Sequence, residues 1–462
     1  MDKNRNLLEK GNIFELLVKL SLPAVVVIII MIVYNIADTY FIGQTGDPNK
    51  IAAISLSMPM FTILSGLGTL FGNGGTTALS IAFGAKDDSK ARNIASFCFY
   101  GGLFVGICYF ILLFFFTEPL ARILGADADT MDMTITYLKV FSFGSPFVLF
   151  SQGFGSLMRA DGDAATAMIA SIIGTVSNIA LDALFILGFH WDIMGAALAT
   201  VLGNVLASVI LIVIILKRKP LLIPHTKDFT LKRDISMTVI TLGLPMACST
   251  LLSSISGAIQ NRLVISYGSI ALAAQGVSGK VGMVATMLIM GFCMGIQPAI
   301  SYNYGAKNYK RMYKVVFETG IFTFVLGIIL AAIVFVVKDQ VVAAFIDNDQ
   351  VIAYGRVFVI AAVVIAPFYA VYQMGQTFMQ STGKASYAIF ASMLDKGIIF
   401  IPVMVIMNGV FGVYGIAFSH AVTMIFSLIV TLFLTRKWSI TLGKETNAFG
   451  DEEDDKNIKK AC

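Results

Sequence analysis

The sequence predicts an all-α integral membrane protein with twelve transmembrane helices in two pseudo-symmetric lobes of six. Of its 462 residues, 57% are hydrophobic and only 13% are charged, and the mean hydropathy is +0.82. Too little polar surface remains to cover a water-soluble globule, and long apolar runs recur along the whole chain. A duplicated pattern of glycine, proline and small residues divides these runs into two equal sets.

Twelve apolar windows are long enough to cross a hydrocarbon core as helices, which takes about 20 residues each. They begin near residues 20, 51, 94, 134, 165, 193, 236, 271, 315, 355, 387 and 412. The first window continues without the small-residue cleavage site of a signal peptide, so we interpret it as the first transmembrane helix. Six crossings return each half of the chain to the side on which it began.

The two halves share the same landmarks at a nearly constant separation. Pro23 corresponds to Pro245 at a shift of 222 residues, and the Ser-x-x-x-Gly-Ala-Lys motif at 80–86 recurs at 301–307, a shift of 221. Near the end of the first copy the shift falls to 220, where Gly195 corresponds to Gly415. Apolar composition alone would not keep such a register, so the chain is predicted to be two copies of one unit.

The distribution of basic residues orients the helices. Most of the 33 lysine and arginine residues fall in loops on the side of the N-terminus, which the positive-inside rule assigns to the cytoplasm. We expect a cytoplasmic N-terminal segment (1–11), an N-lobe (12–218), a cytoplasmic linker (219–232), a C-lobe (233–437) and an acidic cytoplasmic tail (438–462). The net charge of +5 follows from this loop pattern, so no nucleic-acid partner is expected.

Two aspartates of the first copy lie within apolar spans, each with a hydrogen-bonding residue one turn before it. Asp38 follows Tyr34 and Asp182 follows Asn178, and a spacing of four places each pair on one helix face. Thr200, on the next helix, could complete a cluster. Burial favours the neutral form of a carboxyl group, so these acids could take up and release a proton. Their oxygens could instead bind a hard cation such as sodium.

The second copy has no carboxylate at either equivalent position. Gln260 corresponds to Asp38 and Val403 corresponds to Asp182, although the landmark glycines and prolines are kept. If the acids served only to pack the helices, the second copy would need substitutes. A proton or cation site confined to the N-lobe is therefore favoured over a purely structural role.

Charged and titratable residues also occur within the spans of the second copy. They are Arg262, Lys280, Asp395, Lys396 and His420. Arg262 and Lys280 could form structural ion pairs or, together with Gln260, contact a substrate. Adjacent Asp395 and Lys396 could compensate each other, or lie where the lysine reaches water at the helix end. His420 could be a satisfied polar residue between helices or a proton relay.

Six short segments, in order along nearly the whole chain, form a specific combination. They are YNIADTYFIG (34–43), GAKD (84–87), LMRADGD (157–163), NIALD (178–182), GAALAT (195–200) and QPAISYN (297–303). Together they resemble the multidrug and toxic compound extrusion (MATE) transporters, in particular the bacterial DinF/MepA-like branch. The resemblance implies a V-shaped exporter with two six-helix lobes.

The resemblance also implies a function and a site. The function is secondary active multidrug efflux, in which cationic or amphiphilic organic compounds are exchanged for protons or sodium ions by alternating access, giving resistance to antibiotics and other xenobiotics. The implied coupling site, where sodium would also bind, consists of Asp38, Asn178, Asp182 and Thr200, with Tyr34 beside it and Pro23 as a hinge. The NorM-type branch has further carboxylates in the second lobe, but this chain departs from that pattern with Ser253 and Val371.

The remaining expectations concern setting and alternatives. We expect a multi-pass monomer in the bacterial inner (cytoplasmic) membrane, in contact with lipids and small organic cations, with both termini cytoplasmic and no cofactor besides the coupling ion, H⁺ or Na⁺. The main alternative is a flippase for a lipid-linked saccharide or another lipid, although few basic residues lie within the spans to hold pyrophosphate. An enzyme is disfavoured because the chain has no His-Glu-x-x-His or Gly-x-Ser-x-Gly motif.

Overall fold

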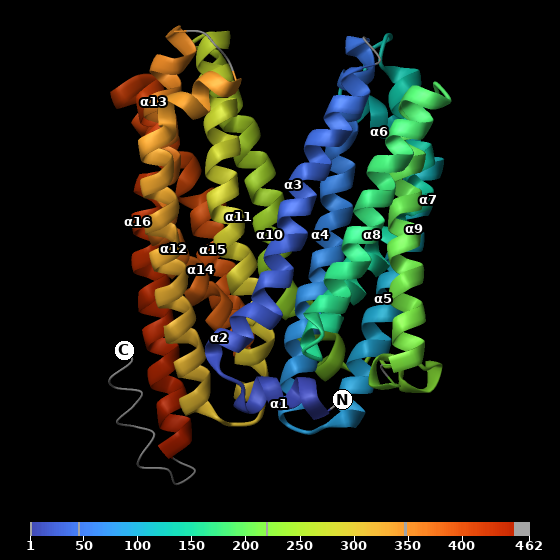
Figure 1. Ribbon diagram of the computed structural model, residues 1–462, viewed down its shortest axis with the longest axis vertical. Helices are drawn as coiled ribbons and strands as arrows, with labels where there is room; N and C mark the ends of the chain where they lie inside the picture. Colours follow the sequence, from blue (N-terminus) through green and yellow to red (C-terminus); the bar gives the residue numbers. More distant parts are fainter. Residues whose placement is uncertain (1, 45–46, 219, 346–348, 448–462) are drawn as a thin grey trace. The chain divides into compact units, whose positions relative to one another are not determined.

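The computed structural model describes residues 2–44, 47–218, 220–345 and 349–447, and within these ranges it is helical almost throughout, without a strand (Figure 1). The chain divides into two compact units. Unit 1 contains Met1–Leu8 and Val26–Ala247, and unit 2 contains Glu9–Val25 and Cys248–Cys462. Each unit therefore combines most of one copy with a short piece of the other.

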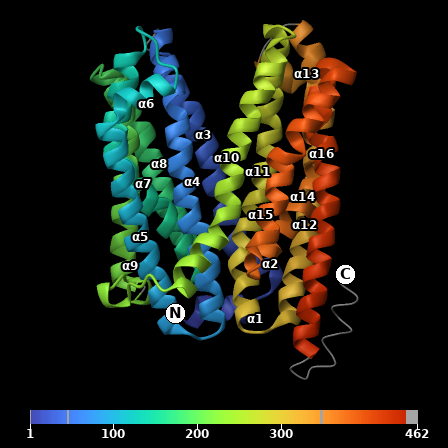
Figure 2. The ribbon, with the colours of Figure 1, turned by 180° about the vertical axis from the view of Figure 1, so that it is seen from behind.

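Unit 1 consists mainly of the helices of the first copy. Within it, α7 packs along α4, α5 and α9, and α8 packs along α9 (Figures 1 and 2). Its elements are α1 (Asp2–Lys10), most of α3 (Leu22–Gly43), α4 (Pro48–Gly84), α5 (Asp88–Phe115), α6 (Thr117–Ile123), α7 (Met131–Ala160), α8 (Ala164–Asp182), η2 (Ala183–Gly188), α9 (Asp192–Arg218), η3 (Pro220–Leu222), η4 (Thr226–Asp228) and the first part of α10 (Arg233–Ile265).

Unit 2 repeats this arrangement with the helices of the second copy, and α11 packs along α12, α13 and α14. Its elements are α2 (Ile13–Leu16), η1 (Leu17–Ser21), the rest of α10, α11 (Ser269–Gly305), α12 (Tyr309–Phe345), α13 (Asp349–Val363), α14 (Ala366–Ser381), α15 (Ala385–Met393), η5 (Leu394–Ile398) and α16 (Phe400–Asn447). Three of the short elements, η1, η2 and η5, are π-helical turns.

Eleven stretches within the described residues are long and apolar enough to cross a membrane. The last of them, Ala385–Lys444, has 60 residues, which would extend about 90 Å if straight, about three times the thickness of a hydrocarbon core. Its backbone breaks at Gly412, where φ is 60° and ψ is −141°. This stretch therefore supplies two crossings, and the prediction of twelve transmembrane helices is confirmed.

The duplication is visible in the backbone of matching loops. Lys86 and Lys307 both take the left-handed conformation that non-glycine residues rarely adopt, with φ of 58° and 57°. In each case the lysine N–H donates to the carbonyl three residues earlier at 3.1 Å. Gly162 and Gly383 likewise share positive φ values of 76° and 82°. The shift of 221 residues predicted from the sequence thus relates equivalent turns.

The first helix of each copy is divided between the two units at equivalent points. The boundaries after Val25 and after Ala247 are separated by the predicted shift of 222. In unit 1, a Cβ on Gly74 of α4 would lie 2.0 Å from the Val239 carbonyl oxygen of α10. In unit 2, a Cβ on the equivalent Gly295 of α11 would lie 2.3 Å from Ser21 Cα. Glycine on the second helix of either copy therefore lets the first half-helix of the other copy approach closely.

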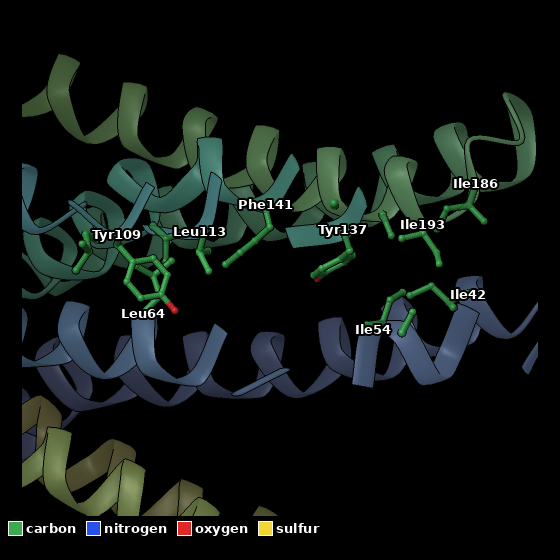
Figure 3. Packing of buried hydrophobic residues seen from close by; sticks show 14 residues of the cluster. Ile42, Ile54, Leu64, Tyr109, Leu113, Tyr137, Phe141, Ile186 and Ile193 are labelled. Atoms are coloured by element: carbon green, nitrogen blue, oxygen red, sulfur yellow. The ribbon is translucent and has the colours of Figure 1, made fainter. Parts of the chain in front are cut away.

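An apolar cluster holds the helices of unit 1 together (Figure 3). Ile42 of α3 and Ile54 of α4 gather at one end of it with Ile186 and Ile193, which flank the turn between η2 and α9. Because lipid is as apolar as these side chains, their close packing stabilises the unit more than exclusion from water does. The cluster fixes the ends of α3 and α8 relative to α9, which are the helices that carry the predicted site.

Candidate functional site

Asn178 and Asp182 occupy the last turn of α8 and are buried, with 4% and 0% of their surface exposed. The spacing of four residues places them on one face of the helix, as predicted. Directly after Asp182 the chain changes to the π-helical turn η2. π-Helical turns within helices are frequent at functional sites, and this one marks the carboxylate end of α8.

Close contacts between α8 and α9 determine which residues are level with each other. A Cβ on Gly203 of α9 would lie 2.8 Å from Asn178 Cβ, and a Cβ on Gly195 would lie 2.9 Å from Phe185 Cβ. The two helices run antiparallel, so Asp182, which lies between Asn178 and Phe185, is level with the stretch between Gly203 and Gly195. That stretch contains Thr200. The sequence Gly195-Ala-Ala-Leu-Ala-Thr200 therefore brings a hydroxyl group to the height of the buried carboxyl group.

Thr200 joins α9 to two further helices. Its Oγ1 lies 3.5 Å from the Tyr34 hydroxyl of α3, at the limit of a hydrogen bond in which either oxygen could donate. One turn later on α9, Asn204 donates from Nδ2 to the Thr200 carbonyl at 2.9 Å. Asn204 Oδ1 accepts from the Ser151 hydroxyl of α7 at 3.1 Å. Thr200 is thus held in place by a polar chain that runs from α3 to α7.

The structure brings four of the five predicted coupling residues into one region of unit 1, formed by α3, α8 and α9. Asp38 belongs to α3, one turn after Tyr34, but its side chain lies outside the described residues. Its role stays a prediction from the sequence. The structure describes the positions of the other four residues, but their roles in coupling also stay predictions.

The donor atoms in this region are carboxylate, amide and hydroxyl groups. Neither amide atom of Asn178 has a hydrogen-bond partner in the part of the chain that the structure describes. A buried amide without partners is costly, so an ion or water is the kind of ligand that would satisfy it. Oxygen donors suit a hard cation such as sodium, and the carboxyl group can alternatively hold a proton.

Pro23, the predicted hinge, is buried near the beginning of α3. The π-helical turn η1 ends two residues before it, and the Leu22 N–H donates to the Leu17 carbonyl five residues earlier. Proline has no N–H to continue a regular α-helical pattern and crowds the preceding turn. The helix therefore changes its hydrogen-bond spacing beside Pro23, and a hinge at this point remains a prediction.

The three residues predicted to contact substrate are spread over two helices of unit 2. Gln260 is half-buried and Arg262 exposed on α10, and Lys280 is exposed on α11. Residues two apart on a helix do not share a face, so Gln260 and Arg262 point in different directions. Their role in substrate binding stays a prediction.

A polar cluster in unit 2 brings together more residues than the sequence predicts. Asp395 is completely buried, its carboxylate is paired with Lys396, and His420 of α16 lies on its other side. The sequence predicts compensation within the adjacent pair but not the contact between Asp395 and His420. One available signal was that His420 corresponds to Thr200 of the first site at the shift of 220.

The sequence of this chain is similar to known membrane proteins along most of its length. The sequence model of the MatE family matches the chain twice, at residues 23–184 and 245–406, and these two ranges are related by the predicted shift of 222. The chain is 32% identical over 413 residues to "Multidrug export protein MepA" of Staphylococcus saprophyticus, covering 89% of this chain and 91% of that protein. The protein of the same name from Staphylococcus aureus strain NCTC 8325 is 32% identical over 414 residues, with the same coverage.

Solved structures show the same fold. A MATE protein crystallised in complex with MaL6 superposes with a TM-score of 0.90 at 22% identity, covering 95% of this chain and 99% of that one. The outward-facing conformation of a multidrug resistance MATE family transporter superposes with a TM-score of 0.87, also at 22% identity, covering 94% and 98%. The fold class predicted from the sequence is therefore confirmed.

Proposed function

This chain belongs to the MATE family of membrane transporters, and we propose that it exports cationic and amphiphilic organic compounds by antiport against protons or sodium ions. Relatives named as multidrug export proteins match 89% of the chain at 32% identity, which supports a multidrug exporter. The prediction of a transporter, not an enzyme, agrees with this family membership. The coupling ion and its site are the parts that the proposal adds.

The observation that carries the proposal is the buried group of oxygen donors in unit 1. Asp182 and Asn178 line one face of α8, and Thr200 lies level with Asp182 and beside Tyr34. An ionised carboxylate is costly to bury away from water, so a buried carboxylate favours binding of a positive ion in place of the lost water. The spacing of four residues in the sequence predicts that Asp38 shares a helix face with Tyr34, so the proposed site has two acids for one cation.

Ion binding at this site can drive export if the ion and the drug favour different conformations. Binding of a proton or sodium ion decreases the net negative charge of the carboxylates by one and lowers the cost of enclosing them between helices. Release of the ion restores the negative charge and makes the enclosed arrangement less favourable. A ligand shifts such an equilibrium only by its difference in affinity for the two conformations. Pro23, beside the change in helix pattern, is the proposed position at which α3 bends.

Efflux from proteoliposomes tests the proposal and separates the two ions. The purified protein is reconstituted with a fluorescent organic cation, and a pH gradient or a sodium gradient is imposed separately. Proton coupling predicts efflux driven by the pH gradient alone, and sodium coupling predicts the converse. Efflux that needs neither gradient would contradict antiport. Scrambling of a labelled lipid without efflux of any organic cation would also contradict antiport and would favour the flippase.

Asp38→Asn in drug-sensitive cells tests the assigned site. We expect resistance to fall to the level of cells without the transporter while the protein is still made. Asp192→Asn is the matched control, because Asp192 pairs with Lys50 at 2.8 Å at the first residue of α9, more than two helical turns before Thr200. Full resistance with Asp38→Asn at normal expression would remove Asp38 from the coupling site.

The cellular setting is part of the proposal. The chain is a multi-pass membrane protein of a transporter family, and we place it as a monomer in the bacterial cytoplasmic membrane with both termini inside. The support is the excess of basic residues in loops on the N-terminal side. A reporter enzyme that is active only outside the cytoplasm, fused after residue 437, would be inactive if this orientation is right.

A further inference from the structure

Unit 2 contains an ion pair on a π-helical turn, in which the carboxylate is buried and the lysine is partly exposed. Asp395 and Lys396 belong to η5, where Asp395 has no exposed surface and its Oδ2 lies 2.8 Å from Lys396 Nζ. On the other side of the same carboxylate, Asp395 Oδ1 lies 3.9 Å from His420 Nε2 of α16. One fully buried acid therefore lies between an ammonium group and an imidazole.

The surroundings of this group are polar on several helices. From α14, Tyr369 lies with its ring 5.9 Å from Lys396 Nζ, and Tyr372 has its hydroxyl 2.7 Å from the amide of Gln376. With the amide oxygen accepting from Tyr372, the amide nitrogen donates to the Ala388 carbonyl at 3.0 Å. The buried thiol of Cys293 on α11 is a further titratable neighbour of Tyr369.

The group also has an accessible edge. The side chains of Lys396 and His420 keep 22% and 31% of their surface exposed, whereas Asp395 has none. An ammonium group within a membrane-spanning helix is costly in contact with hydrocarbon, so we expect this edge to face water. On that expectation, a proton would reach His420 from this edge without displacement of the helices that cover Asp395.

The duplication argues that this group is not needed to build the fold. Asp395 corresponds to Gly174 of unit 1 at the shift of 221. A Cβ on Gly174 would lie 2.8 Å from Ala207 Cβ, so α8 and α9 meet there without any side chain. A buried ion pair is weak evidence for stability, because apolar packing is often as good or better. The same scaffold thus folds without charge at this place in unit 1, and the charges in unit 2 call for another explanation.

We propose that Asp395, Lys396 and His420 form a proton-binding site of unit 2, in addition to the site around Asp182. A proton from water binds to His420 Nε2 and gives an imidazolium, and the Asp395 carboxylate then pairs with two cations instead of one. No bond other than that to the proton is formed or broken. Binding of a proton at this site does not depend on the proposed export activity. A role of the site in coupling proton movement to export does rest on that proposed function.

Histidine resonances provide a direct test, because the chain has only three histidines, His190, His225 and His420. The full-length protein, labelled with ¹⁵N-histidine, is placed in lipid nanodiscs and its spectrum is followed against pH, and His420→Gln identifies the resonance. We expect the His420 resonance to change with pH as the imidazole takes up a proton, within the range over which the protein stays folded. No protonation of His420 over that range would overturn the proposal.

Two further variants test the roles of the neighbours by their opposite signs. Asp395→Asn removes the negative charge beside the imidazole and should lower the proton affinity of His420 roughly tenfold or more. Lys396→Met removes a positive charge and should raise that affinity. If Asp395→Asn fails to fold, Lys396→Met alone still tests the site. Equal proton affinity in the wild type and in every folded variant would show that the three residues do not act together.

Participation in export is measured separately. His420→Thr introduces the residue found at the equivalent position of the first copy, Thr200, and should decrease the number of protons released per bound drug molecule and flatten the pH dependence of efflux. An unchanged proton count and pH profile would exclude His420 from coupling. If the wild type transports no drug, the proposed export function fails, while the histidine spectra still decide whether the proton site exists.

Discussion

The two copies of one scaffold carry acids in different chemical settings. In unit 1, Asp182 lies at the end of a regular helix among amide and hydroxyl groups, represented by Asn178 and Thr200. In unit 2, Asp395 lies on a π-helical turn between an ammonium group and an imidazole. The first arrangement offers negative charge and oxygen donors to an incoming cation. In the second arrangement the lysine already compensates the negative charge, so the group whose charge can change is the imidazole.

This difference assigns separate tasks to positions that the duplication made equivalent. Thr200 and His420 are related by the shift of 220, and each makes a polar contact within its own unit. Thr200 contacts Tyr34 of the first helix, whereas His420 faces Asp395 of the fifth helix of its copy. The position on the sixth helix is thus used in both copies, but with different chemistry. The following variants test how far the two settings are independent.

The largest effect is expected from Asp182→Asn. Loss of the carboxylate that lies level with Thr200 should decrease gradient-driven efflux by about 100-fold, equivalent to about 2.8 kcal/mol. The measurement is the initial rate of drug efflux from proteoliposomes at matched protein content, with Asp192→Asn as control. The proton affinity of His420, followed by its resonance, should not change. A decrease of less than twofold would place the coupling acid elsewhere.

Asp395→Asn should have the next largest effect, on stability. It leaves the Lys396 ammonium group without its carboxylate partner, and we expect the free energy of unfolding to fall by about 2 kcal/mol. Complete burial of both partners would make the loss larger, but Lys396 retains exposed surface. Unfolding by SDS in mixed micelles measures the change. The double variant Asp395→Asn with Lys396→Met should recover most of the stability, and a double variant no better than the single one would show that the pair is not the cause.

Gly203→Ala tests the close approach of α8 and α9 in unit 1. The new methyl group would lie 2.8 Å from Asn178 Cβ, so the helices must separate, at a cost of about 1.5 kcal/mol in stability. Displacement of Asn178 should also weaken ion binding. Gly153→Ala on α7 is the matched control, because nothing lies within 4 Å of its Cβ position. The second copy has Thr423 at the equivalent place, which shows that the repeat itself does not require glycine.

The smallest effect is expected from Thr200→Val. The contact between Thr200 Oγ1 and Tyr34 Oη is long at 3.5 Å, so its loss should cost about 0.5 kcal/mol, or about a twofold change in ion affinity. Comparison with Tyr34→Phe and with the double variant isolates the contribution of this pair. Additive effects of the two substitutions would mean that the hydroxyl groups act separately on the bound ion.

Much of the architecture was predictable because lipid imposes strong constraints on sequence. The length of each apolar run must match the membrane, and the glycine and proline landmarks must fit the same turns in both copies, as Lys86 and Lys307 show. The π-helical turns η1, η2 and η5 were not predicted, since a single additional residue per turn leaves no distinct pattern of side chains. The linear sequence also gave no measure of the distance between Asp395 and His420, which lie 25 positions apart and meet only through packing of η5 against α16.

The sharing of first-helix halves bears on how such a chain can arise. A single copy made alone would lack the segment that packs against the glycine of its second helix, Gly74 in the first copy and Gly295 in the second. Two identical half-length chains could supply this segment to each other, as in domain swapping. We therefore expect the ancestral gene to have encoded an obligate swapped homodimer, whose stability depended on its own concentration. Fusion of two such genes would remove that dependence and allow each copy to acquire its acid at a different position.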